Sequence, residues 1–178
     1  MTTSTNRSRT TPLQLLGTQW PIVQAPMAGV QGSALAVAVS QAGGLGSLPC
    51  AMLTLDALGA ELRAITQQTS KPYNVNFFCH AVPSPNAAKE AAWRTALAPF
   101  YQQHGIDASS IAPGAGRAPF SHAAIDVLEG FKPPVVSFHF GLPAPDLLAR
   151  VKAWGAVVLS SATTVAEARW LEAHGADV

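Results

Sequence analysis

The sequence predicts an α/β protein of the (β/α)8 TIM-barrel type that extends over about the first five βα units. Short β-rich runs alternate with helical segments, which is typical of parallel strands joined by right-handed crossovers. Polar residues stand at the ends of several successive strands, as expected for a ring of strand ends around one site. Because Gly29–Gly32 does not match a Gly-x-Gly-x-x-Gly fingerprint, a doubly wound dinucleotide-binding sheet is disfavoured.

The first half of the chain contains three expected strands and two expected helices. Strands are expected where apolar residues run between turn residues, and helices where apolar residues recur at helical spacing. Leu58, Leu62 and Ile65 show that spacing. In chain order these elements are strand 21–27, helix 33–41, strand 45–49, helix 55–68 and strand 73–79.

A longer excursion follows the third strand before the alternation resumes. We interpret its Gly/Pro-rich stretch, 113–119, as a flexible loop or a lid over the site. Gly43, Gly155 and Gly175 each follow a helix, where a left-handed cap turns the chain into the next strand. The remaining expected elements are helices 87–103 and 121–131, strand 134–140, helix 146–154, strand 156–161 and helix 165–174.

Composition indicates a globular protein with a large core, since 48% of the 178 residues are hydrophobic and 12% are charged. A net charge of +1 without a basic stripe argues against nucleic acid or an anionic membrane as a partner. No apolar run is long enough for a membrane span. Residues 1–12 lack the apolar core of a secretory signal, so we expect them to form a disordered tail instead of a signal peptide. Cys50 and Cys79 form no CxxC pair, which favours reduced thiols and a cytoplasmic location.

The length of the chain does not fit a complete barrel. A (β/α)8 barrel takes about 250 residues, and this chain has 178. It stops at Ala176–Val178, where a sixth strand would begin. We therefore expect residues 13–178 to be the N-terminal part of a longer barrel, whose open sheet edge self-associates.

His139 is the strongest candidate for chemistry. Side chains alternate along a strand, so Ser137 and His139 share one face of 134–140, while Val136, Phe138 and Phe140 share the other. The apolar face suits a covering helix. The opposite face then holds an imidazole at the carboxyl end of a parallel strand, where such enzymes keep their chemistry. A core histidine satisfied by its neighbours is the alternative.

Two asparagines stand inside the third strand. Asn74 and Asn76 alternate with Val75 and Phe77, which puts both amides on the face opposite the helices. A buried amide needs a hydrogen-bond partner, so either a ligand or a cross-strand bond is expected. Asn74 fits the cross-strand bond better.

Other strand ends add candidates. Pro26 lacks an N–H, so its backbone either faces a ligand or simply ends a strand. The small residues Ser161 and Ala162 follow the fifth strand and suit a flat ring, whereas Thr163 or Thr164 suits the N-cap of the next helix. Gly43–Gly46 follows a helix, which indicates a tight turn and not a phosphate loop. Cys79–His80 has no ligand spacing with the other cysteine or with the remaining histidines, so no metal is predicted.

Four motifs in order carry a resemblance to a known family. The segments Gln24–Val30, Ala38–Ser47, Tyr73–His80 and Ser137–Gly141 resemble the nitronate monooxygenases, formerly called 2-nitropropane dioxygenases, and the likeness runs from about Leu13 to Val178. The resemblance implies an FMN-dependent barrel enzyme that oxidises alkyl nitronates, such as propionate 3-nitronate, with molecular oxygen.

The resemblance also implies roles for single residues. His139 would be the catalytic base, a role that suits histidine as a residue type, since the unperturbed imidazole has a pKa of about 6.5. The segment Ala25, Pro26, Met27 would lie against the flavin ring, and Asn76 would contact it. Ser161 and Ala162 complete the expected flavin-binding set.

The expected truncation restricts this interpretation. Barrels bind phosphate with loops after strands seven and eight, so the 178 residues alone are expected to bind FMN weakly and to be inactive. Two alternatives stay open: another FMN barrel, such as a flavin-dependent enoyl-thioester reductase, and a non-catalytic fragment. The Ser137–Gly141 motif argues against the reductase.

Overall fold

The computed structural model describes residues 11–82, 84–111 and 117–178. The described residues form two compact units: the larger lies within 11–80 and 117–178, and the smaller within 81–111. The expected disordered tail lies outside the described residues over 1–10, as does most of the expected loop at 113–119. Pro12, which the sequence places in that tail, is the first residue of a helix, and Thr11 is its N-cap.

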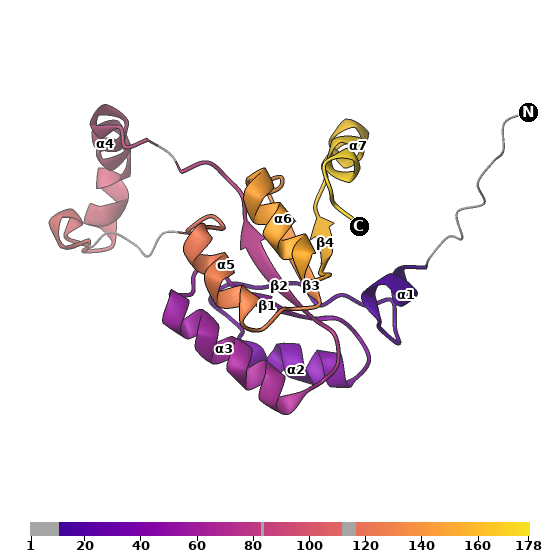
Figure 1. Cartoon of the computed structure of the whole chain (residues 1–178). Coiled ribbons are helices and arrows are strands. Elements are labelled where there is room, and N and C mark those ends of the chain that lie inside the picture. The colour runs from indigo at the N-terminus through magenta and orange to yellow at the C-terminus, as the bar shows by residue number, and fades with distance from the viewer. Residues whose placement is uncertain (1–10, 83, 112–116) are drawn as a thin grey trace, which may run out of the picture. The chain divides into compact units, whose positions relative to one another are not determined.

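The larger unit is built on one parallel sheet (Figure 1). Its strands follow one another in the order β1-β2-β3-β4, so each strand pairs with the next along the chain. This arrangement confirms the predicted βα repeats. The strands are β1 Gly46–Pro49, β2 Tyr73–Phe78, β3 Val135–His139 and β4 Val157–Ser160.

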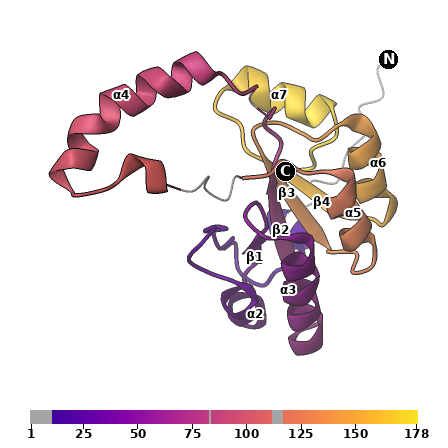
Figure 2. The same cartoon turned by 90° about the vertical axis from the view of Figure 1, so that its left-hand side faces the viewer.

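The helices of this unit alternate with the strands along the chain, and the four that contribute to the main core cover one face of the sheet (Figures 1 and 2). Thr54, Ser121 and Thr164 cap three of them, each accepting a hydrogen bond from the backbone N–H three residues on, which satisfies a donor that the helix cannot pair. The helices of this unit are α1 Pro12–Leu16, α2 Ser33–Gln41, α3 Leu55–Gln68, α5 His122–Glu129, α6 Pro145–Ala153 and α7 Val165–Ala173.

The main core lies between the sheet and helices α2, α3, α5 and α6. Strand residues Val75, Val136 and Phe138 point into it and are fully buried. The opposite, inner face carries a smaller apolar cluster of Leu16 and Val135 with neighbours, next to buried polar side chains. The two faces follow the alternation that the sequence predicts.

The expected first strand, 21–27, is reduced to one bridge between Val23 and Leu45. Beyond that bridge, side chains take the place of a neighbouring backbone. Gln24 Oε1 accepts from the Ser47 N–H at 2.9 Å, and Gln31 Nε2 donates to the Ser47 carbonyl at 3.0 Å. The edge of β1 is thereby satisfied without a strand, which corrects our expectation.

At the other edge of the sheet, the end of the chain pairs with β4. The N–H groups of Asp177 and Val178 donate to the Val158 carbonyl at 2.8 and 3.2 Å, and Ser160 N–H donates to the Val178 carbonyl at 3.0 Å. The backbone thus lies beside β4 where the sequence predicts a sixth strand to begin.

The smaller unit, within residues 81–111, contains α4 Ala87–Gln103 and a short 3-10 helix, Ala108–Ser110. Asn86 caps α4 by accepting from the Lys89 N–H at 2.9 Å. No residue of α4 is buried. Within the described ranges of both units, no helix has the length and apolar character needed to cross a membrane.

Three glycines adopt the left-handed conformation predicted for them. Gly43, Gly155 and Gly175 have φ angles of 94°, 85° and 114°, which other residues rarely adopt. Gly46 is constrained differently, because a Cβ at this position would overlap the Ala36 carbonyl of α2. The close approach of α2 to β1 therefore depends on glycine at 46.

Replacing Gly46 tests that approach. We expect Gly46→Ala to lower the free energy of unfolding by about 3 kcal/mol or more, because two backbones must separate. Gly130→Ala is the matched control: Gly130 has a φ of −69°, and a new Cβ would lie 3.5 Å from the Val127 carbonyl oxygen. This variant should be neutral or more stable by up to about 1 kcal/mol. Urea denaturation measures both, and equal stabilities would contradict the prediction.

Candidate functional site

The candidate site lies at the carboxyl edge of the sheet. His139 is the last residue of β3 and is paired in register with Phe78, the last residue of β2. Its half-buried side chain lies on the inner face of the sheet, the same face as Ser137. Its Nδ1 lies 2.8 Å from Ser161 Oγ, just beyond β4. Within the part of the chain that the structure describes, no residue bonds to Nε2.

A buried polar network lies one layer deeper on the same face. Asn74 Nδ2 donates to Ser47 Oγ at 3.0 Å and to Ser137 Oγ at 2.9 Å, and Asn76 Nδ2 donates to Ser137 Oγ at 2.8 Å. These are the cross-strand bonds that we considered for both amides. Among the described residues, the buried Oδ1 of Asn74 has no donor, and no hydrogen bond reaches Oδ1 of Asn76.

The segment Ala25, Pro26, Met27 follows the bridge at Val23 and stays outside the sheet. Its shape is held by the two glutamines, since both side-chain amides donate to the Ala25 carbonyl. Neither Ala25 N–H nor Met27 N–H donates to any described residue, and Pro26 has none to donate. The Met27 side chain is 45% exposed.

The residues after β4 divide into two groups. Ser161 and Ala162 are exposed, and Ser161 is the one that reaches His139. Thr164 caps α7 through the Glu167 N–H at 3.1 Å, while the Thr163 hydroxyl donates to the Glu167 carboxylate at 2.9 Å. Both threonines therefore serve the helix start.

The aromatic side chains that lie near His139 were not predicted from the sequence. The ring centroids of Phe78 and Phe140 lie 6.1 and 6.4 Å from that of His139, and His80 lies 6.2 Å from Phe140. We expected Phe140 to face the helices, and this is wrong. The strand ends at His139, and Phe140 has a φ of 66° that leaves it 66% exposed. Gly141, with a φ of 95°, is the sequence signal for this turn.

Neither cysteine is poised for reaction. Burial raises the pKa of the Cys79 thiol to about 12 and also raises that of Cys50, since desolvation disfavours the thiolate. Both thiols are free. The described residues contain no group of three or more histidine, cysteine or acidic side chains placed to hold a metal ion.

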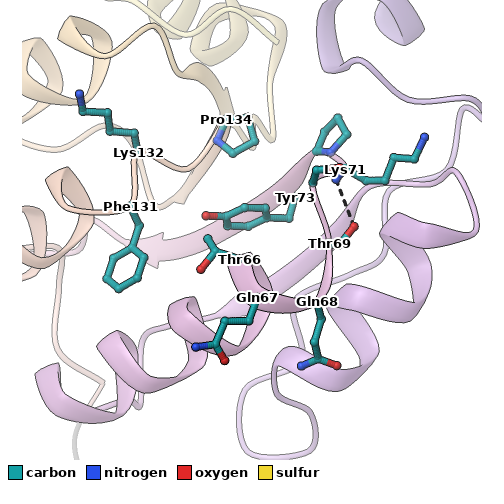
Figure 3. A pocket seen from close by; sticks show the side chains of 11 residues that line it. Thr66, Gln67, Gln68, Thr69, Lys71, Tyr73, Phe131, Lys132 and Pro134 are labelled. Carbon is teal, nitrogen blue, oxygen red and sulfur yellow. Dashed lines mark hydrogen bonds between the residues drawn. The ribbon is translucent and has the colours of Figure 1, made fainter.

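A cavity of about 600 Å³ lies at the opposite end of the strands (Figure 3). Tyr73, Phe131 and Pro134 line it near the starts of β2 and β3. In Figure 3 the ammonium groups of Lys71 and Lys132 point away from the Tyr73 ring. The cavity therefore offers no converging charge, and in such folds this end serves stability more than chemistry.

Comparison with known proteins gives one consistent result. The family model described as nitronate monooxygenase matches residues 9–178. Nitronate monooxygenases of Paraburkholderia phytofirmans and Pseudomonas aeruginosa are 42% and 40% identical to the chain, covering 93% and 92% of it and 45% and 47% of their own lengths. The chain thus spans about half the length of these curated relatives.

Solved structures agree with the sequence relatives. Nitroalkane oxidase from Streptomyces ansochromogenes superposes with a TM-score of 0.76 at 38% identity, over 90% of this chain and 45% of that one. FabK from Thermotoga maritima superposes with a TM-score of 0.64 at 26% identity, over 93% and 41%. The first match confirms the barrel type of fold that the sequence predicts.

The polar network can be tested through its shared acceptor. Ser137→Ala removes the hydroxyl that accepts from Asn74 and Asn76, so we expect a loss of about 1–3 kcal/mol in the free energy of unfolding. Ser70→Ala changes an exposed serine and should stay within about 0.5 kcal/mol. A loss at Ser137 no larger than at Ser70, measured in urea, would exclude a stabilising network.

Thiol reactivity tests the burial of Cys79. A pKa near 12 instead of 9.0 lowers the thiolate fraction at pH 8 about a thousandfold. We therefore expect iodoacetamide to alkylate Cys79 about three orders of magnitude more slowly in the folded chain than in 8 M urea, as followed by mass spectrometry of the Cys79 peptide. Rates within tenfold of each other would contradict a buried thiol.

Proposed function

The chain belongs to the nitronate monooxygenase family, and from that premise we propose that it forms the flavin-ring side of a site that oxidises alkyl nitronates. The substrate is of the propionate 3-nitronate type, the oxidant is molecular oxygen and the cofactor is FMN. The supporting observation is His139, which stands at the carboxyl end of β3 on the inner face, with Nδ1 on Ser161 and Nε2 not bonded to any described residue.

The residues at this edge fit a flavin ring. An isoalloxazine presents apolar faces and carries carbonyl acceptors along its edge. The N–H groups of Ala25 and Met27, which donate to no described residue, and the exposed Met27 side chain offer both kinds of partner. Asn76 adds an amide oxygen that accepts no bond from the described residues, suited to a ring N–H. In this proposal Ala25, Pro26, Met27 and Asn76 hold the ring, and Ser161 and Ala162 lie beside it.

The cofactor and His139 have separate roles in the proposed reaction. Bound FMN supplies the electron acceptor. His139 supplies Nε2, which takes the α-proton of a nitroalkane or, when protonated, donates a hydrogen bond to a nitronate oxygen. Phe78 and Phe140 lie beside the imidazole, with ring centroids 6.1 and 6.4 Å from that of His139.

A second candidate function rests on the structural match to FabK. We keep a flavin-dependent enoyl-thioester reductase as that alternative. The match to nitroalkane oxidase has the higher identity, 38% against 26%, and the higher TM-score, 0.76 against 0.64. Oxygen consumption with a nitronate supports the first function, and NADH-driven reduction of an enoyl thioester supports the second.

Partners and location follow as further proposals. The free Cys50 and Cys79 are in keeping with a reducing, cytoplasmic compartment. Self-association through the sheet edge at β4 remains our prediction from the sequence. Asp177 and Val178 occupy only part of that edge, and size-exclusion chromatography at several concentrations tests it.

His139 is the residue whose replacement tests the proposed function. In the flavin-loaded protein, His139→Ala should lower kcat/KM for propionate 3-nitronate by about 10²- to 10⁴-fold, because the base is lost. An oxygen electrode measures the rate, and visible absorbance measures the flavin content, which should not change. His104→Ala, a histidine that ends α4 in the smaller unit, is the control and should keep the rate. Because the 178 residues alone are expected to bind FMN weakly and to be inactive, the assay uses a complete barrel that contains them. Flavin-loaded wild-type protein of this kind that consumes no oxygen with nitronate would exclude the function, whereas an active His139→Ala would exclude only the base.

A further inference from the structure

Ser161 is placed opposite His139 by the register of the sheet. Phe138 of β3 pairs with Ser160 of β4, so the next residue along each chain, His139 and Ser161, also face each other. The side chains of His139 and Ser161 both lie on the inner face of the sheet. The resulting distance of 2.8 Å between Nδ1 and Oγ is that of a hydrogen bond.

A neutral imidazole carries its proton on one of two nitrogens, and its partner decides which. A base that acts through Nε2 needs the proton on Nδ1. A hydroxyl can accept from Nδ1–H or donate to an unprotonated Nδ1. The first arrangement is the one that leaves Nε2 free to act as a base, and unlike a carboxylate the hydroxyl adds no charge. Among the described residues the Ser161 hydroxyl is the one side chain bonded to this ring.

We propose that Ser161 is a positioning residue that holds His139 in its Nδ1–H tautomer, so that the lone pair of Nε2 faces the substrate side. This inference rests on the proposed function and gives Ser161 a role that acts through His139 instead of through the flavin. The Ser161 hydroxyl accepts from Nδ1–H, and its own proton stays available for another acceptor.

The aromatic neighbours of His139 do not determine how its ring is oriented, so the hydrogen bond with Ser161 does. Phe78 and Phe140 flank the imidazole at centroid distances of 6.1 and 6.4 Å, with interplanar angles of 52° and 61°. Such edge contacts are apolar and select neither ring nitrogen. Ser161 itself is exposed, so its removal leaves the core intact.

Nitrogen-15 NMR of the histidine rings tests the inference without flavin or nitronate. In the wild-type chain at alkaline pH, we expect the protonated-nitrogen shift on Nδ1 of His139. Ser161→Ala should lose this preference, and Ser161→Thr, which keeps the hydroxyl, should retain it. Dispersed amide resonances check folding. A wild-type ring protonated on Nε2, or a tautomer unchanged in Ser161→Ala, would overturn the inference.

Kinetics separate this inference from the proposed function. In the flavin-loaded protein, Ser161→Ala should lower kcat for propionate 3-nitronate by about 10- to 100-fold while KM changes little, because the base is misprotonated and not removed. Ser161→Thr should recover most of the rate. A complete, flavin-loaded barrel that contains this chain and shows no nitronate oxidation would refute the function and leave the tautomer result standing, whereas an unchanged kcat in Ser161→Ala would refute the positioning role alone.

Discussion

The parallel pairing of β2, β3 and β4 is the constraint on which the rest of the structure depends. In a parallel ladder the register fixes which residues end side by side, and the alternation of side chains fixes which face they share. Phe78 and His139 are brought together in this way, and Ser161 lies opposite His139 one step past β4. A shift of one residue would turn His139 into the helix layer and bring Phe138 to the inner face.

Each face of the sheet stabilises the register of β2, β3 and β4 by a different kind of interaction. On the helix side, Val136 and Phe138 are fully buried, so any shift would expose large apolar side chains. On the inner side, Asn74, Asn76 and Ser137 form bonds that also depend on their alignment. A buried amide without a partner costs more than a bond contributes, so the network penalises misalignment. The position of His139 at the edge thus depends on both faces.

The edge of β1 shows how backbone groups stay outside the sheet where an expected strand does not form. Gln24 and Gln31 satisfy Ser47 with their side chains, and the backbone at Ala25, Pro26 and Met27 is released from the ladder. The N–H groups of Ala25 and Met27 donate to no described residue. This segment and His139 lie within the region, residues 9–178, that the nitronate monooxygenase model matches. The family membership and the local geometry therefore concern the same residues, over about half the length of the relatives.

The sequence by itself determined the elements and the faces. Helices 33–41, 55–68 and 87–103 have the predicted bounds, because helical periodicity and caps are local signals. The parity of His139 and the left-handed glycines follow from equally local rules. Helix α1 also had its signal, a capping box between Thr11 and Gln14 with Pro12 at the helix start, which we passed over.

Only the tertiary structure decided what depends on residues far apart in the chain. The strand expected at 21–27 gave way to side-chain bonds from Gln24 and Gln31 to Ser47, 23 and 16 positions away. The contact of His139 with Ser161 spans 22 positions, and the bonds from Asn74 and Asn76 to Ser137 span more than 60. Composition and periodicity report how one segment folds. The contact between His139 and Ser161 forms only when β3 and β4 pair, because the register of these strands is a property of the whole sheet.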